Sequence, residues 1–209
     1  MIPGPDKVVG CPHCEGAAKY TSLLSCNELD MEDWTDGEVV DDLPPTLVKC
    51  PHCGRFFRLY DEDDFFGPGG TEPETEEEEN APYLEEPSEE DLLKALAQGR
   101  ARDPDEETEL RLLAWRRRND RYRSRVSFFT PEDIDGWKEN LDALLTLLNE
   151  ELEQQRILKA EILREKGAFA EAKALLSGPF SAESRATATF ILSLCDQKDT
   201  RVRLIGRET

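Results

Sequence analysis

Two copies of the tetrapeptide Cys-Pro-His-Cys constrain this chain more than any other feature of its sequence. One copy starts at Cys11 and the other at Cys50, with 35 residues between the two copies. A tight turn that carries two thiolates can present both sulfurs to one ion. Two such turns complete the tetrahedral shell of four thiolates that Zn²⁺ takes in structural sites. The spacing therefore predicts a single structural zinc ion with four ligands: Cys11, Cys14, Cys50 and Cys53.

Two other interpretations of the tetrapeptides stay open. Cys-Pro-His-Cys is also similar to the active-site tetrapeptide of thiol–disulfide oxidoreductases of the thioredoxin fold, where the first cysteine begins a helix inside a βαβ unit. Only ten residues precede Cys11, and no amphipathic helix follows either copy. A zinc site that opens when its thiols are oxidised is the second alternative. Because four cysteines are available, we expect His13 and His52 to be outward-facing turn residues rather than ligands.

The residues around both tetrapeptides resemble those of zinc-ribbon proteins. KCPHCGRFF, at Lys49–Phe57, resembles the second knuckle of that family, and CPHCEG, at Cys11–Gly16, resembles the first. The family usually has a glycine directly after each second cysteine, and Glu15 departs from this pattern. The resemblance covers about the first 60 residues. It implies a small three-stranded sheet pinned by one zinc ion, and three runs of residues favour strands: Ala17–Ser25, Thr46–Lys49 and Arg55–Tyr60.

Charge and composition divide the chain into three regions. The 209 residues include 26 Lys and Arg against 46 Asp and Glu, a net charge of −20, which excludes a protein that coats nucleic acid through overall basicity. The segment 67–87 is dominated by Gly, Pro and Glu, and it cannot bury enough apolar surface to offset the entropy of ordering. We therefore expect a zinc ribbon at 1–66, an acidic flexible linker at 67–87 and a helical domain at 88–209.

The third region has helical patterning almost to its end. Capping residues mark three helix starts, at Ser88, at Asp103-Pro104 and at Thr130-Pro131. An apolar stripe of helical period follows the last of them: Ile134, Trp137, Leu141, Leu144, Leu145 and Leu148. Five to seven helices are predicted, with short connections that favour antiparallel neighbours. The fold class is therefore α+β, a small ribbon module followed by an all-α region.

One stretch of the helical region resembles a known repeat. Leu158–Leu176 is similar to the helix–turn–helix of a tetratricopeptide repeat, on six residues: Ala160, Leu163, Gly167, Phe169, Ala172 and Leu176. The resemblance implies a repeat-like helical hairpin. No second copy is visible, and a stable array needs roughly three repeats, so an ordinary helical bundle is an equal alternative.

The segment Arg111–Arg125 holds seven arginines and two aromatic residues. Guanidinium groups match phosphates and aromatic rings can stack on bases, so the segment is a candidate for nucleic-acid contact. It can equally be the solvated end of an amphipathic helix, or it can pair with the acidic linker. The candidate interaction residues are Trp115, Arg116, Arg117, Arg118, Arg121 and Arg123.

Two further features favour structural roles. The acidic insertion Ser25–Pro45 is expected to be a solvated loop on the ribbon, with Trp34 as its anchor. Cys195 is expected in the core of a late helix, and Cys26 as a small buried or loop residue.

These patterns favour a zinc-binding adaptor that binds another protein. A closed shell of four cysteines leaves no position for substrate, and no catalytic triad, phosphate loop or dinucleotide fingerprint is present, so we expect no enzyme. No apolar run reaches the ~18 residues of a spanning helix, and Met1–Gly10 lacks a secretory pattern, which favours a cytoplasmic protein without membrane contact. The alternative is a regulatory nucleic-acid-binding protein that uses Arg111–Arg125. The order of ribbon, acidic spacer and repeat-like helices resembles that of a type of bacterial protein, and this resemblance carries no activity with it.

Overall fold

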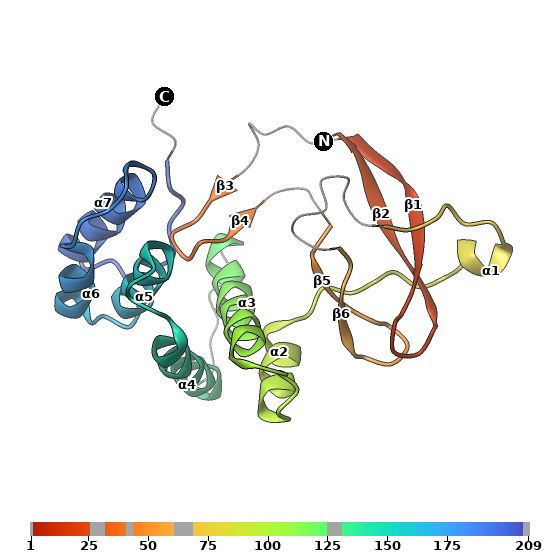
Figure 1. The fold of residues 1–209 in the computed structure, drawn as a ribbon, viewed down its shortest axis with the longest axis horizontal. Helices are drawn as coiled ribbons and strands as arrows, with labels where there is room; N and C mark the ends of the chain where they lie inside the picture. Colours follow the sequence, from red (N-terminus) through yellow and green to blue (C-terminus); the bar gives the residue numbers. More distant parts are fainter. Residues whose placement is uncertain (1, 26–31, 41–43, 61–68, 125–130, 207–209) are drawn as a thin grey trace. The chain divides into compact units, whose positions relative to one another are not determined.

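A computed structural model describes residues 2–25, 32–40, 44–60, 69–124 and 131–206 of the chain (Figure 1). The described strands are β1 (Ile2–Gly10), β2 (Ala17–Ser25), β3 (Glu32–Asp33), β4 (Val39–Val40), β5 (Leu47–Lys49) and β6 (Phe56–Arg58). The described helices are α1 (Glu76–Glu79), α2 (Glu89–Ala97), α3 (Pro104–Arg123), α4 (Pro131–Leu147), α5 (Glu153–Glu165), α6 (Phe169–Leu176) and α7 (Ala182–Asp196). Antiparallel strand pairs followed by helices confirm the predicted α+β class. Within the described residues, none of the helices combines the length and the apolar character that crossing a membrane requires.

The chain forms two compact units that do not follow the order of the sequence. The first, here called the cysteine unit, comprises Met1–Met31 and Asp41–Pro87, and the second, the helical unit, comprises Glu32–Val40 and Ser88–Thr209. Of the two boundaries expected from composition, the one at 87 coincides with a boundary between the units, whereas the one at 66 lies within the cysteine unit. The β3–β4 hairpin therefore belongs with the helices, although its sequence lies between the two cysteine pairs.

The cysteine unit contains two antiparallel pairs, β1 with β2 and β5 with β6. The described strands of the chain form three separate two-stranded sheets rather than the three-stranded sheet that the zinc-ribbon resemblance implies. The reason is that the segment 82–85 runs between the two pairs. On one side, the N–H of Lys19 in β2 donates to the carbonyl of Pro82 at 2.9 Å, and the N–H of Leu84 donates to the carbonyl of Lys19 at 2.8 Å. On the other side, the N–H of Lys49 in β5 donates to the carbonyl of Glu85 at 2.7 Å.

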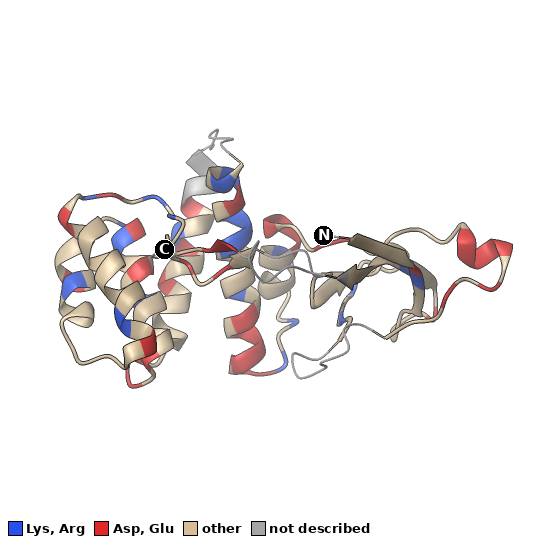
Figure 2. Cartoon of the chain, turned by 90° about the horizontal axis from the view of Figure 1, so that it is seen from above, with Lys and Arg blue, Asp and Glu red and all other residues tan. Residues whose placement is uncertain are grey.

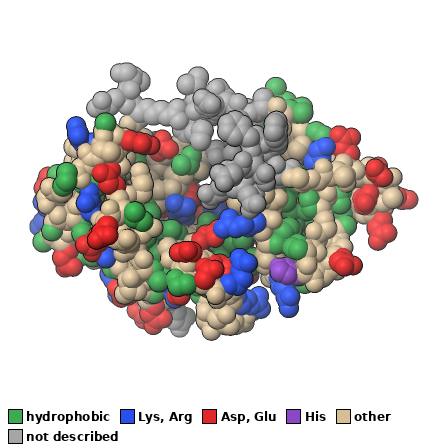
Figure 3. Space-filling model, viewed as in Figure 1, with side chains coloured by type: hydrophobic (Ala, Val, Ile, Leu, Met, Phe, Trp, Pro, Cys, Tyr) green, Lys and Arg blue, Asp and Glu red, His purple; other side chains and the backbone are tan. Residues whose placement is uncertain are grey.

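The described part of the acidic segment, 69–87, belongs to the cysteine unit. The N–H of Val8 in β1 donates to the carbonyl of Thr71 at 2.8 Å, and the Tyr83 hydroxyl donates to Asp6 at 2.6 Å. The short helix α1 within this segment exposes glutamate side chains on the surface (Figure 3). Hydrogen bonds to strand edges hold this segment against the sheets, and Ala81 and Leu84 add apolar contacts.

The helical unit begins where the capping pattern predicts. The Ser88 side chain accepts from the N–H of Asp91 in a capping box, and Asp103 accepts from the N–H of Glu106 with Pro104 in the first turn. The helix α3 is acidic in its first turn and basic in its last (Figure 2). The residue Thr130 and the side chain of Ile134 lie outside the described residues.

Two apolar clusters form the core of the helical unit. The first joins α3, α4 and α5 through five buried side chains: Trp115, Leu141, Leu144, Leu148 and Ile162. The second joins α5, α6 and α7 through Ile157, Ala160, Ala172, Leu176, Ala188, Ile191 and Cys195. Cys195 therefore lies in the core, as predicted. Both α5 and α6 contribute a fully buried alanine, which lets the two helices approach closely, so the region 158–176 forms a helical hairpin.

Candidate metal centre

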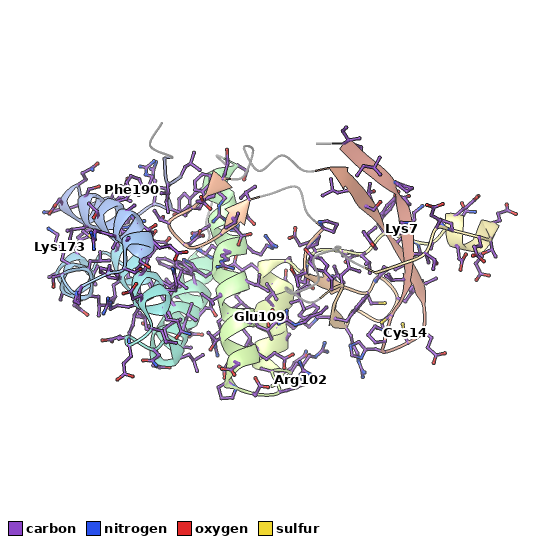
Figure 4. The ribbon with its side chains drawn as sticks, turned by 45° about the horizontal axis from the view of Figure 1, so that its top comes forward. Lys7, Cys14, Arg102, Glu109, Lys173 and Phe190 are labelled. Carbon is purple, nitrogen blue, oxygen red and sulfur yellow. The ribbon has the colours of Figure 1, made fainter. Side chains whose placement is uncertain are left out.

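The four cysteines of the two tetrapeptides converge on one point in the cysteine unit. Their sulfur atoms all lie within 4.8 Å of one another. The Sγ atoms of Cys11 and Cys53 are 3.8 Å apart, and those of Cys14 and Cys50 are 3.7 Å apart. All four are free thiols, two buried and two exposed. Figure 4 labels Cys14, which lies at the turn that joins β1 to β2.

These distances fit a single tetrahedral ion. A zinc–sulfur bond of about 2.3 Å places the sulfurs of a tetrahedral shell roughly 3.8 Å apart. A disulfide requires about 2.05 Å, so neither close pair is bonded. Four sulfurs with no fifth ligand among the described residues make a closed site that can hold one metal ion.

The two cysteine turns repeat each other at the level of the backbone. In the first, the N–H of Glu15 donates to the carbonyl of Cys11 at 2.8 Å, and in the second Gly54 donates to Cys50 at 2.9 Å. In each turn the N–H of the histidine lies 3.4 Å from the sulfur of the first cysteine. These N–H groups stabilise negative charge on sulfur, as a thiolate ligand requires.

The ionisation of the thiols shows why a cation belongs among them. Burial opposes ionisation of Cys50, but N–H groups of His52 and Cys53 and the neighbouring thiols outweigh it and lower the pKa of Cys50 to about 7. The Gly16 backbone favours the Cys14 thiolate, but desolvation and the three neighbouring sulfurs raise the pKa of Cys14 to about 12. Near neutral pH the Cys50 thiol therefore ionises readily, whereas the Cys14 thiol keeps its proton. A divalent ion in the shell supplies the charge that four thiolates need.

The two histidines join the turns to each other. The Nε2 of His13 lies 2.9 Å from the carbonyl oxygen of Phe56, and the Nε2 of His52 lies 2.8 Å from that of Ala17. A carbonyl only accepts, so each Nε2 carries the proton it donates. Each imidazole thus bonds the strand that leaves the other turn. Both side chains are exposed and neither belongs to the sulfur cluster, as expected from the sequence. The hydrogen bonds between the turns were not predicted. The histidine at the same position of both tetrapeptides was the available signal.

Three of the six candidate interaction residues face other helices of the same unit. They are Trp115, Arg118 and Arg121. Trp115 is fully buried, and its Nε1 donates to Glu165 of α5 at 2.8 Å. Arg118 and Arg121 contact Glu89 of α2 at 3.1 and 3.6 Å. The segment also includes Arg125, which lies outside the described residues.

The other three arginines face the β3–β4 hairpin rather than the acidic linker. Arg116 and Arg117 lie 3.3 and 3.7 Å from the Glu38 carboxylate, and Arg123 lies 2.5 Å from Asp36. The expectation of a solvated loop is therefore wrong for residues 32–40. Asp36 is fully buried, because the guanidinium group and the amide of α3 replace its water. The Asp-Gly turn signal could have revealed the hairpin, but no local pattern revealed its burial. The remainder of the insertion, with Cys26, lies largely outside the described residues.

Three comparisons with known proteins found no match to this chain. No family model matches it, and searches of curated proteins and of solved structures also return no match.

Proposed function

We propose that this chain is a zinc-binding adaptor of a reducing compartment. The observation that carries the proposal is the closed shell of four sulfurs within 4.8 Å of one another. A shell without an open position holds its ion for structure rather than for catalysis. The ion would be held by Cys11, Cys14, Cys50 and Cys53, and it would fold a unit in whose described part the apolar cluster has three buried members.

Cobalt substitution tests the metal site. The purified full chain should bind one equivalent of Co²⁺, with the intense absorption of a tetrahedral thiolate complex, and Zn²⁺ should displace it. Replacement of Cys53 by Ser should remove this spectrum, and the matched variant Cys26→Ser should keep it. A spectrum that Cys53→Ser leaves unchanged, or a chain that binds no metal, would rule the site out.

The helical unit supplies the partner-binding part of the proposal. A pocket of about 310 Å³ opens between α6 and α7, lined by Leu176, Gly178, Pro179, Phe180, Arg185, Ala188, Thr189 and Leu192. Its lining mixes apolar side chains with polar groups, including Thr189 and Arg185, a combination suited to an apolar side chain that lies beside an acidic group of a protein partner. In this proposal, the hairpin of α5 and α6 is one repeat of the tetratricopeptide type.

A capture experiment tests the adaptor function. The metal-loaded full chain should capture one protein partner in a fixed molar ratio from a lysate of its source cells. The partner should be captured both from nuclease-treated and from untreated lysate. The substitution Leu192→Asp, in the pocket, should abolish the capture, whereas Glu183→Lys, at an exposed position of the same helix, should not. Capture that survives Leu192→Asp would place the partner elsewhere. Recovery of nucleic acid only in the untreated sample would favour the alternative function.

No observation favours the alternative of nucleic-acid binding through Arg111–Arg125. Six of its arginines pair with carboxylates of the same unit, and a phosphate would have to displace those carboxylates.

A further inference from the structure

The β3–β4 hairpin ends in a turn whose shape is fixed by its own hydrogen bonds. The N–H of Gly37 donates to the carbonyl of Trp34 at 2.9 Å, and the N–H of Glu38 donates to the Asp36 carboxylate at 3.2 Å. Gly37 adopts a φ of 73°, a conformation that glycine reaches without a steric penalty. The hairpin therefore presents two carboxylates, those of Asp36 and Glu38, and two backbone carbonyls at its tip.

The helix α3 binds that tip through charged and amide side chains. The Arg123 guanidinium donates to both oxygens of Asp36, at 2.6 and 2.5 Å, and the Asn119 amide donates to one of them at 2.9 Å. Arg116 donates to the carbonyl of Gly37 at 2.8 Å and to that of Asp36 at 3.4 Å. Burial opposes the charge of Arg123, but Asp36 and Asp120 beside it raise its pKa. This geometry favours a carboxylate at residue 36, because a neutral side chain there would remove one of the two carboxylates, Asp36 and Asp120, that pair with the buried Arg123.

The C-terminal segment pairs with the same hairpin through an isolated antiparallel bridge between Trp34 and Leu204. The N–H of Thr35 donates to the carbonyl of Arg203 at 2.9 Å, and the N–H of Arg203 donates to the Thr35 hydroxyl at 3.0 Å. The N–H of Ile205 donates to the carbonyl of Asp33 at 2.8 Å. Main-chain bonds of this kind give affinity, and the pockets beside them give specificity.

Shape adds a further restriction at the tip. A Cβ at residue 37 would lie 3.0 Å from Leu158 of α5 and 3.2 Å from Arg116. The guanidinium of Arg123 also lies 5.1 Å from the centre of the Trp34 ring, within range of a cation–π contact. The helical unit therefore accepts glycine directly after the aspartate and an aromatic ring two residues before it.

We propose that this surface, named here the turn site, is a peptide-binding site for an acidic β-turn with the sequence Trp-Thr-Asp-Gly-Glu. The turn site comprises Arg116, Asn119 and Arg123 of α3, Leu158 of α5 and the segment 203–205. The hairpin 32–40 is its resident ligand, because the chain enters from the cysteine unit before residue 32 and returns to it after residue 40.

A peptide-binding experiment on the full chain tests the proposal. Residues 32–40 are replaced by a Gly-Ser linker of equal length, and a fluorescent synthetic peptide of residues 32–40 is titrated in while its anisotropy is recorded. The replaced chain should bind the peptide, and the natural chain, whose site is occupied, should not. A peptide carrying Asp36→Asn should bind at least tenfold more weakly. In the replaced chain, Arg123→Gln should abolish binding, and Arg102→Gln, at an exposed arginine before α3, should not.

A second measurement covers the case in which the replaced chain does not fold. Protease sites are inserted before residue 32 and after residue 40 of the natural chain, which keeps the hairpin in place until cleavage. Native mass spectrometry after cleavage should show the excised hairpin still bound, and in the Arg123→Gln chain it should dissociate. A helical unit that stays folded while the excised hairpin leaves would overturn the proposal. So would a folded replaced chain that does not bind the peptide.

Discussion

Residues 15 and 54 occupy equivalent places in the two cysteine turns but differ in chemistry. Both follow the second cysteine directly, and both have left-handed backbone, with φ of 60° at Glu15 and 68° at Gly54. A side chain other than glycine in this conformation costs roughly 1 kcal/mol, because its Cβ crowds the following carbonyl. The first turn therefore carries strain that the second turn avoids.

Separate substitutions at residues 15 and 54 should change the affinity for Zn²⁺ in opposite directions. We expect Glu15→Gly to tighten Zn²⁺ binding by about fivefold and Gly54→Ala to weaken it by a similar factor, the equivalent of roughly 1 kcal/mol. Competition with a chromophoric chelator measures both. Glu15→Gln, which removes the charge but keeps the strain, is the control. Equal affinities of the Gly and Gln variants would show that backbone strain is not the cause.

Glu165 carries a buried carboxyl, and among the described residues no cation pairs directly with it. Its two oxygens accept from Trp115 at 2.8 Å and from Asn119 at 3.1 Å. Burial, followed by the negative charges of Glu161 and Asp36, raises the pKa of Glu165 well above its ordinary value. The folded state therefore keeps this proton at a pH at which the unfolded state has lost it.

This proton should make the helical unit less stable as the pH rises. The stabilisation is complete below the ordinary pKa of glutamate, and it falls as the pH rises through the folded pKa, by up to about 1.4 kcal/mol per pH unit. Urea unfolding at a series of pH values, followed by circular dichroism, should show that Glu165→Gln reduces this fall. The exposed Glu183→Gln should not. A Glu165→Gln chain whose pH dependence matches that of the natural chain would contradict the prediction.

At the scale of elements, the two histidines hold the β1–β2 and β5–β6 pairs in one arrangement around the sulfurs. Each donates a hydrogen bond from its own turn to the strand that follows the other turn. The side chain of His52 also lies over Gly16, where a Cβ would come within 2.6 Å of its ring. This close approach explains why glycine follows Glu15.

Removal of either imidazole should loosen the metal site without removing a ligand. We expect His13→Ala and His52→Ala each to weaken Zn²⁺ binding by about fivefold, from the loss of one hydrogen bond worth roughly 1 kcal/mol. The Co²⁺ spectrum should stay that of a four-sulfur site. Arg55→Ala, at an exposed position of the second turn, is the control. A change in the number of sulfur ligands would mean that a histidine belongs to the shell.

At the scale of the whole molecule, the chain passes between its two units three times, before residue 32, after residue 40 and at residue 88. The cysteine unit has a small apolar cluster of Tyr20, Val48 and Leu59, whereas the helical unit has two larger ones. A unit with so small a core needs a further source of stability, which a metal ion held by the four cysteines would supply. Such an ion would also close the loop that carries the hairpin, which would lower the entropy lost when the hairpin docks.

Metal removal should therefore affect the two units differently. We expect a chelator to abolish the hydrogen-exchange protection of β1, β2, β5 and β6, to reduce that of residues 32–40 severalfold, and to leave α3–α7 protected. Mass spectrometry of exchanged peptides, with and without Zn²⁺, measures all three. Loss of protection throughout the helices would show that the two units unfold as one.

The parts that sequence reasoning predicted correctly depend on short-range contacts. The capping boxes at Ser88 and Asp103 need only residues within one helical turn, and the expected strand at Ala17–Ser25 matches β2. The burial of Cys195 follows from the apolar run around it. The partners of the arginine-rich helix were not predictable in this way. Asp36 and Arg123 are 87 residues apart, and many other carboxylates offer the same charge.

The sequence by itself determined the four-cysteine turns and the helical character of residues 88–209, because spacing and capping act over a few residues. The tertiary structure alone decided that the insertion between the cysteine pairs leaves its own unit and is held by α3. It also decided that the acidic segment 69–87 lies along the strands of the cysteine unit. Both outcomes rest on hydrogen bonds and ion pairs between distant segments. Such pairing is selected by the geometry of the folded chain, since the charges involved have many equivalent partners in the sequence.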